Sequence, residues 1–297
     1  MKDEGGNFSS FILYLTGAFP VQDPILSLIL RSWSWQPFIL LGLGSVAVGY
    51  AYGFYYFRRQ GWLERMFRQG LIKRSQPWYF AAGLVTLGLA LLSPIDTLSN
   101  VLFVMHMTQH ILLVMVAAPL ILLGLPAPFL RPLIQNTQLK TGLAWLTHPV
   151  VAFTLYNVTL LVWHMPALYD AALRNEVIHD LEHALFFYTA LLSWWPLLSP
   201  LPELPRLSYP AQMLYIFLIA IPGGILGALI VFAGDVLYPT YAAAPRLWDL
   251  SALADQQTAA LVMMIPSKAI YLIALTVVFF IWFSQDEDEP VGQGQLL

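Results

Sequence analysis

The chain contains no cysteine, so its chemistry has to do without thiols. Disulfide bridges and thiolate metal sites are excluded, because both need cysteine sulfur. Any metal ligand must therefore be histidine, methionine, a carboxylate or a backbone group.

Charged residues are also scarce. They make up 10% of the 297 residues, against 58% hydrophobic residues, and the mean hydropathy is +0.67. A soluble domain has roughly 25% charged residues, so this composition predicts an integral membrane protein in contact with lipid. The formal net charge of -3 gives no bulk attraction to nucleic acid, and no nucleic-acid partner is expected.

Long apolar runs are abundant, and strand-like alternation is missing. Runs of about 20 residues are long enough to cross a bilayer as helices. The fold class expected is all-α, a polytopic membrane bundle of about seven transmembrane helices over residues 35–284. An interfacial segment is expected at 1–34 and an acidic cytoplasmic tail at 285–297. The seven runs cover 37–57, 77–95, 100–125, 149–169, 177–199, 210–233 and 256–283.

Basic residues predict the orientation. The connections on one side hold nine lysines and arginines, six of them between Arg58 and Arg74, and the opposite side holds four. Because cytoplasmic loops carry the excess of Lys and Arg, the Arg58–Arg74 connection is predicted in the cytoplasm. The N-terminus is then outside and the C-terminus inside.

Five of the six histidines fall at the outer ends of the predicted spans. His106 and His110 are four residues apart on one helix face, and His179 and His183 repeat that spacing. His164 follows on a third span. Ionisable residues at membrane depth normally face a partner, a cavity or an ion, so these five are candidate metal ligands. The sixth, His148, precedes a proline and is interpreted as a helix-start residue.

Polar residues near the same outer surface are candidates to orient those ligands or to guide a cation inward. Methionines near the site are possible soft ligands, and thioether combined with imidazole favours Cu(I), although methionine is also an ordinary packing residue. The polar candidates are Asp96, Gln109, Glu182, Asp235, Asp255 and Gln256, and the methionines are Met105, Met107 and Met165.

Several other interpretations stay open. Two facing histidines could hold a b-type haem, as in a membrane cytochrome or quinone-linked redox subunit. The string His179–His183 also matches the H-x-x-E-H pattern of some zinc proteases, but no third-ligand motif follows it. A scaffold with buried hydrogen-bonded histidines would need no metal. Trp194, Trp195, Tyr238 and Tyr241 are expected in interfacial aromatic belts.

Ordered motifs from Ser93 to Ile281 resemble the CtaG family of caa3-type cytochrome c oxidase assembly factors, of the multi-pass Bacillus kind. The resemblance implies a non-enzymatic protein of the bacterial plasma membrane that handles copper for a cytochrome c oxidase subunit; self-association is left open. The motifs are Ser93-Pro-Ile-Asp96, His106-Met-x-Gln-His110, Trp163-His-x-Pro166, Leu168-Tyr169, His179-x-Leu-Glu-His183, Trp194-Trp-Pro196, Leu237-Tyr-Pro239 and Asp255-Gln-Gln257.

Overall fold

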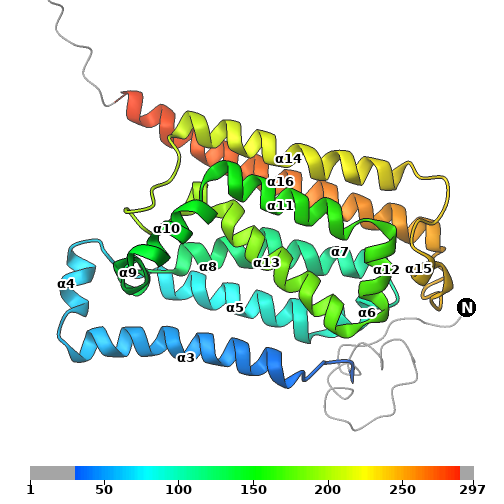
Figure 1. Ribbon diagram of the computed structural model, residues 1–297, viewed down its shortest axis with the longest axis horizontal. Coiled ribbons are helices and arrows are strands. Elements are labelled where there is room, and N and C mark those ends of the chain that lie inside the picture. Colours follow the sequence, from blue (N-terminus) through cyan, green and yellow to red (C-terminus); the bar gives the residue numbers. More distant parts are fainter. Residues whose placement is uncertain (1–30, 288–297) are drawn as a thin grey trace, which may run out of the picture.

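The computed structural model describes residues 31–287, and every regular element in that part of the chain is a helix (Figure 1). The all-α prediction is therefore confirmed. The elements are α3 (Pro37–Arg59), α4 (Leu63–Arg68), α5 (Gln76–Leu92), α6 (Pro94–Ser99), α7 (Phe103–Ile111), η1 (Leu112–Ala117), α8 (Ala118–Gly124), α9 (Ala127–Gln135), α10 (Thr137–Leu146), α11 (Pro149–Trp163), α12 (Pro166–Arg174), α13 (Glu176–Leu198), α14 (Tyr209–Val231), α15 (Pro239–Ala243) and α16 (Ala252–Glu287).

The long helices run roughly side by side along the long axis of the molecule (Figure 1). Helix α13 lies in the middle of the bundle, packed against α11, α8 and η1, and it buries side chains along its whole length. Helices α14 and α16 pair along one side. Helix α3 lies on the opposite side, and none of its side chains is buried.

Within residues 31–287, four helices are long and apolar enough to cross a membrane, which supports a multi-pass membrane protein. They are Pro37–Arg59, Phe103–Gly124, Tyr209–Val231 and Ala252–Gln285, and a pair bent by 62°, Thr137–Leu146 with Pro149–Trp163, raises the number to five. Each of the seven expected runs contains a helix. However, α5 is short, and α13 carries Glu176, Asp180 and Glu182, so the count of seven remains a prediction.

Prolines shorten two of the expected runs. Helix α5 stops at Leu92, and the Ser93 hydroxyl accepts a hydrogen bond from the amide of Ile95 to start α6 at Pro94. Helix α11 stops at Trp163 instead of continuing to 169, and Pro166 begins α12. Proline disfavours helical geometry in the residue before it, so each break falls just ahead of one.

A π-helical turn, η1, interrupts the third run between α7 and α8. The carbonyl of Val114 within it accepts a hydrogen bond of 3.0 Å from the Trp194 indole N–H. Both Trp194 and Trp195 are buried, as are Tyr238 and Tyr241. The expectation that these four form interfacial belts is therefore wrong, because each fills the bundle interior.

Close packing joins α14 to α16. A side chain at Gly227 would overlap the side chain of Met264, so the glycine permits this contact. Lys268 of α16 is half-buried, and its ammonium donates to the carbonyl of Ala220 on α14.

His148 stands at the start of α11, as the sequence predicted.

The expected interfacial segment 1–34 and acidic tail 285–297 fall almost entirely outside the described residues.

Candidate metal centre

Helix α7 is positioned by a carboxylate from the far end of the chain. Asp255 of α16 is fully buried, and its oxygens accept hydrogen bonds from the amides of Phe103 (2.8 Å) and Val104 (3.0 Å). Leu102 precedes the helix and supplies no side-chain cap, so Asp255 satisfies two of the free amides at the start of α7. The first turn of α7 is thereby held just before His106.

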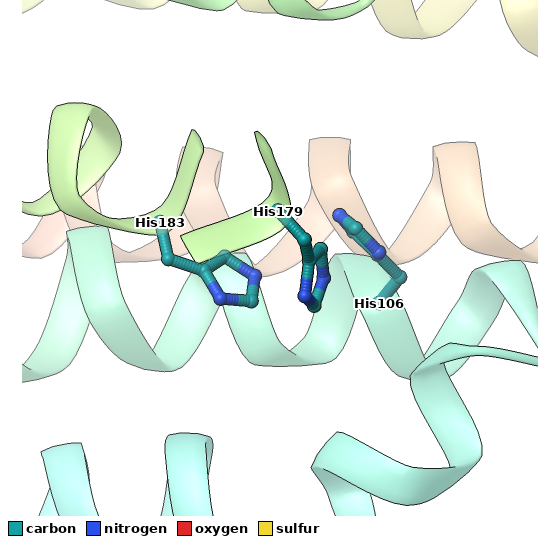
Figure 2. A group of neighbouring side chains, drawn as sticks. All are labelled: His106, His179 and His183. Atoms are coloured by element: carbon teal, nitrogen blue, oxygen red, sulfur yellow. The ribbon is translucent and has the colours of Figure 1, made fainter. Parts of the chain in front are cut away.

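Three imidazoles from two helices meet beside that turn. His106 of α7 faces His179 and His183 of α13 (Figure 2), with ring centroids 5.3 and 5.7 Å from the His106 ring. His179 and His183 lie one helical turn apart, and their rings are 4.1 Å from each other. All three residues are buried, so the four-residue spacing does place both rings on the face that meets α7.

Glu182 brings a buried carboxylate into the same cluster. Its Oε1 lies 3.7 Å from Nε2 of His106 and 3.7 Å from Nε2 of His110, and the residue is 0% exposed. These separations are too long for hydrogen bonds. Donors bound to one tetrahedral ion at 2.0–2.1 Å stand about 3.3 Å apart, so small side-chain movements would close the shell.

The polar atoms of this cluster lack hydrogen-bond partners within the part of the chain described. Buried atoms without a partner include both nitrogens of His106 and both carboxylate oxygens of Glu182. The Nε2 atoms of His110, His179 and His183 are also buried and unpaired among the described residues. Buried polar groups are normally paired, and a concentration of unpaired ones points to a ligand or a proton between them. The donor set therefore fits a cation.

Among the described residues, two groups of three donors have all their ligand atoms within 4.8 Å of one another. One is His106, His179 and His183, and the other is His106, His110 and Glu182. They share His106, so the two groups form one continuous set of five residues.

His164 stands at the edge of this set. Its ring centroid is 6.4 Å from that of His110, and its Nδ1 donates to the carbonyl of Leu160 at 2.8 Å. That bond leaves Nε2 as the free nitrogen, and it too is buried without a partner among the described residues. His164 can contribute one ligand atom from a fixed direction.

Asp96 and Gln109 form a separate polar contact on the α5 side of α7. The Gln109 amide donates to Oδ1 of Asp96 (3.0 Å) and to the carbonyl of Ala90 (2.9 Å). Burial raises the pKa of Asp96, and the hydrogen bond from Gln109 acts in the opposite direction. These two residues brace the histidine-bearing helix against α5 and α6.

The remaining acidic and amide candidates shape the neighbouring loop. Gln256 accepts from the amide of Leu237 (2.7 Å) and donates to the carbonyl of Asp235 (3.2 Å). The Asp235 side chain itself is exposed. Gln256 thus ties the α14–α15 connection to α16, while a role for Asp235 in attracting cations stays a prediction.

The three candidate methionines differ in burial. Met107 is buried in an apolar group with Phe103 and Met263, Met105 is half-buried, and Met165 is 59% exposed. Coordination by these thioethers stays a prediction.

A wall of buried tyrosines beside the histidines was not expected from the sequence. The Tyr169 ring lies 5.1 Å from that of His106. The Tyr238 hydroxyl donates to the backbone carbonyl of His164 (3.1 Å), and the Tyr241 hydroxyl donates to the backbone carbonyl of Ser99 (2.6 Å). The sequence motifs include Tyr169 and Tyr238, but the contacts depend on how α12, α15 and the residues before α15 pack against α7, which periodicity does not predict.

Fold and site together define a multi-pass helical membrane protein with a buried histidine–glutamate cluster. The model of the family "Cytochrome c oxidase caa3 assembly factor" matches residues 48–285. The chain belongs to this family, as the sequence motifs predicted.

Curated relatives from mycobacteria match most of the chain. An uncharacterised protein of Mycobacterium bovis is 24% identical and aligns with 84% of this chain and 39% of its own length. One of Mycobacterium leprae is 23% identical, aligning with 96% of this chain and 44% of its own. This chain therefore spans about two fifths of the length of these relatives. No solved structure matches it.

Proposed function

We propose that this protein is an assembly factor that binds copper at the histidine–glutamate cluster and delivers it to a subunit of a haem-copper cytochrome c oxidase. Family membership supports the oxidase as the destination. The observation that carries the metal role is the set of buried imidazole and carboxylate atoms without hydrogen-bond partners among the described residues. In this proposal the protein performs no catalysis, and copper is its cargo.

The donor chemistry suits a metal that must leave again. Imidazole binds copper in both common oxidation states, and without thiolates the site offers ligands that exchange readily. It also avoids the oxidation that thiols undergo outside the cytoplasm.

The shared ligand His106 offers a route between two positions. His179 is the most exposed member, at 9%, and lies near the start of α13, whereas Glu182 is 0% exposed. An ion entering at His179 would be held by His179, His183 and His106. It would then move to His106, His110 and Glu182 without losing His106, so that coordination never drops to zero.

The proposal includes the topology predicted by the basic residues. Seven spans, with the Arg58–Arg74 connection in the cytoplasm, would place the protein in the bacterial plasma membrane and the cluster in its outer half. Copper supplied or accepted on the outer side would then reach the site without crossing the whole bilayer.

Metal analysis of the purified protein tests the binding step. Protein expressed with copper in the medium should retain copper, and His106→Gln should lose it while keeping the same melting temperature to within a few degrees. Retention of neither copper nor iron by the unaltered protein would contradict the metal role. A Soret band with reducible alpha and beta peaks would favour the haem alternative instead.

Oxidase assembly in cells tests the delivery step. A strain whose own gene is replaced by the His106→Gln, His110→Gln version should have membranes with reduced cytochrome c oxidase activity and reduced copper per oxidase. Unchanged oxidase activity would contradict delivery and leave a scaffold role, and cleavage products that vanish with Glu182→Gln would point to proteolysis.

A further inference from the structure

A basic cavity lies at the end of the bundle opposite the histidine cluster. It has a volume of about 380 Å³ and is enclosed by the start of α5, the α8–α9 connection and the α13–α14 connection. Three cationic side chains line it, from Lys73, Arg131 and Arg206.

Two of these cations lack an acidic partner within residues 31–287. Arg131 pairs with Glu203 (Nε to Oε1, 3.2 Å), while Arg206 donates to the backbone carbonyl of Ser199. No carboxylate within the described part of the chain forms an ion pair with Lys73 or Arg206. The cavity therefore carries an excess of positive charge. Its rim also includes Gln76, whose side-chain amide donates a hydrogen bond to the Leu125 carbonyl.

An apolar groove of about 610 Å³ adjoins this cavity, and Leu125 lines both. The groove runs between α3 and the rest of the bundle, with walls that include Gly42, Leu84 and Leu191. Helix α3 spans it as a loosely attached outer wall, held by Tyr50, which stacks on the Phe80 ring at 3.8 Å and donates to the carbonyl of Gly124.

We propose that the cavity and groove together bind one anionic phospholipid, with the phosphate among the cations and the acyl chains between α3 and the bundle. An occupant must be anionic at one end and apolar over a long distance, because the charged cavity and the apolar groove share a wall. A soluble anion would leave the groove unfilled, and a zwitterionic lipid would leave the excess charge unbalanced. Basic pockets between membrane helices suit such headgroups.

Native mass spectrometry of the full chain in detergent tests the headgroup contact, with phosphatidylglycerol and phosphatidylcholine as probes. Phosphatidylglycerol should be retained preferentially. The variant Lys73→Gln, Arg206→Gln should weaken its binding by about 25-fold, at about fivefold for each cation near a membrane surface. The matched control Arg58→Gln, Arg59→Gln removes equal charge from the end of α3, outside the cavity, and should change binding by less than about twofold.

The groove is tested separately with Gly42→Phe. Gly42 lines the groove, and a Cβ added to it meets none of the described atoms within 4 Å, so a side chain can be introduced there without moving the backbone. It should lower phosphatidylglycerol retention at least fivefold at an unchanged melting temperature. The proposal would be overturned if both lipids were retained equally, or if the two double variants lost binding equally. It would also be overturned if Gly42→Phe had no effect, or if millimolar inorganic phosphate displaced the lipid completely.

Discussion

His106 is the residue that joins the two donor groups, and both of its nitrogens are buried without a partner in the described structure. His164 differs, because one nitrogen is already bonded to the Leu160 carbonyl. Single residues of the same type therefore have unequal importance at this site.

The His106→Gln variant should lose more copper affinity than His164→Gln. Loss of a residue that only hydrogen-bonds to a metal ligand lowers metal affinity by ~10–100-fold. Removing the shared ligand His106 should therefore lower copper affinity by more than that, whereas His164→Gln should lower it by about tenfold or less. Competition titrations with a chromogenic copper chelator measure both values. Equal losses would show that His106 is not the shared ligand.

Asp255 is predicted to act through α7 and not on the metal directly. Asp255→Asn replaces the carboxylate whose two oxygens accept amide hydrogen bonds, and the loss of one acceptor and of the charge should destabilise the protein by about 1–2 kcal/mol. Hydrogen exchange at Phe103 and Val104 should quicken, and the thermal midpoint in detergent should fall. Asp235→Asn is the matched control, because that side chain is exposed, and it should leave both measurements unchanged.

At the scale of elements, apolar run length predicted where helices occur but not where they break. A run of about 20 residues is dictated by bilayer thickness, so the helices within 37–57, 210–233 and 256–283 could be anticipated. The breaks at Ser93-Pro94 and after Trp163 fall just ahead of prolines, and the π turn η1 depends on local backbone hydrogen bonding. Hydropathy measures neither effect.

Helix α5 offers a direct comparison between two glycines. A Cβ at Gly83 would lie 2.6 Å from Cγ1 of Ile121, whereas Gly88 has no atom within 4 Å. Gly83→Ala should push α5 away from α8 and destabilise the protein by about 1–3 kcal/mol.

The control Gly88→Ala should be neutral or stabilise by up to ~1 kcal/mol, because alanine favours helix. Thermal unfolding in detergent separates the two variants. Similar midpoints for both would contradict the tight α5–α8 contact.

For the whole molecule, the absence of cysteine makes the predicted orientation easy to test. Gln60 follows α3 and Glu176 starts α13, and both are exposed. In intact cells a membrane-impermeant maleimide should label Glu176→Cys and should label Gln60→Cys only after lysis. The reverse pattern would place the histidine cluster on the cytoplasmic side.

The sequence anticipated the composition of the candidate site better than its internal arrangement. Helical spacing and topology brought His106, His110, His179 and His183 to one level, and the structure packs them together. Their role as ligands remains a prediction. The contact of Asp255 with the start of α7 joins residues about half the chain apart. The buried tyrosines lie on or beside the short helices α12 and α15, whose packing against α7 does not follow from periodicity.

Glu182 has a consequence for which ion the cluster can hold. Neutral imidazoles around one ionised carboxylate sum to a single negative charge. A monovalent cation would bring that sum to zero and a divalent one would leave a single positive charge, and either sum is smaller than the charge the ion would carry among imidazoles alone in a region of low dielectric. The buried carboxylate would thus favour a cation over an anion or a neutral ligand at this cluster.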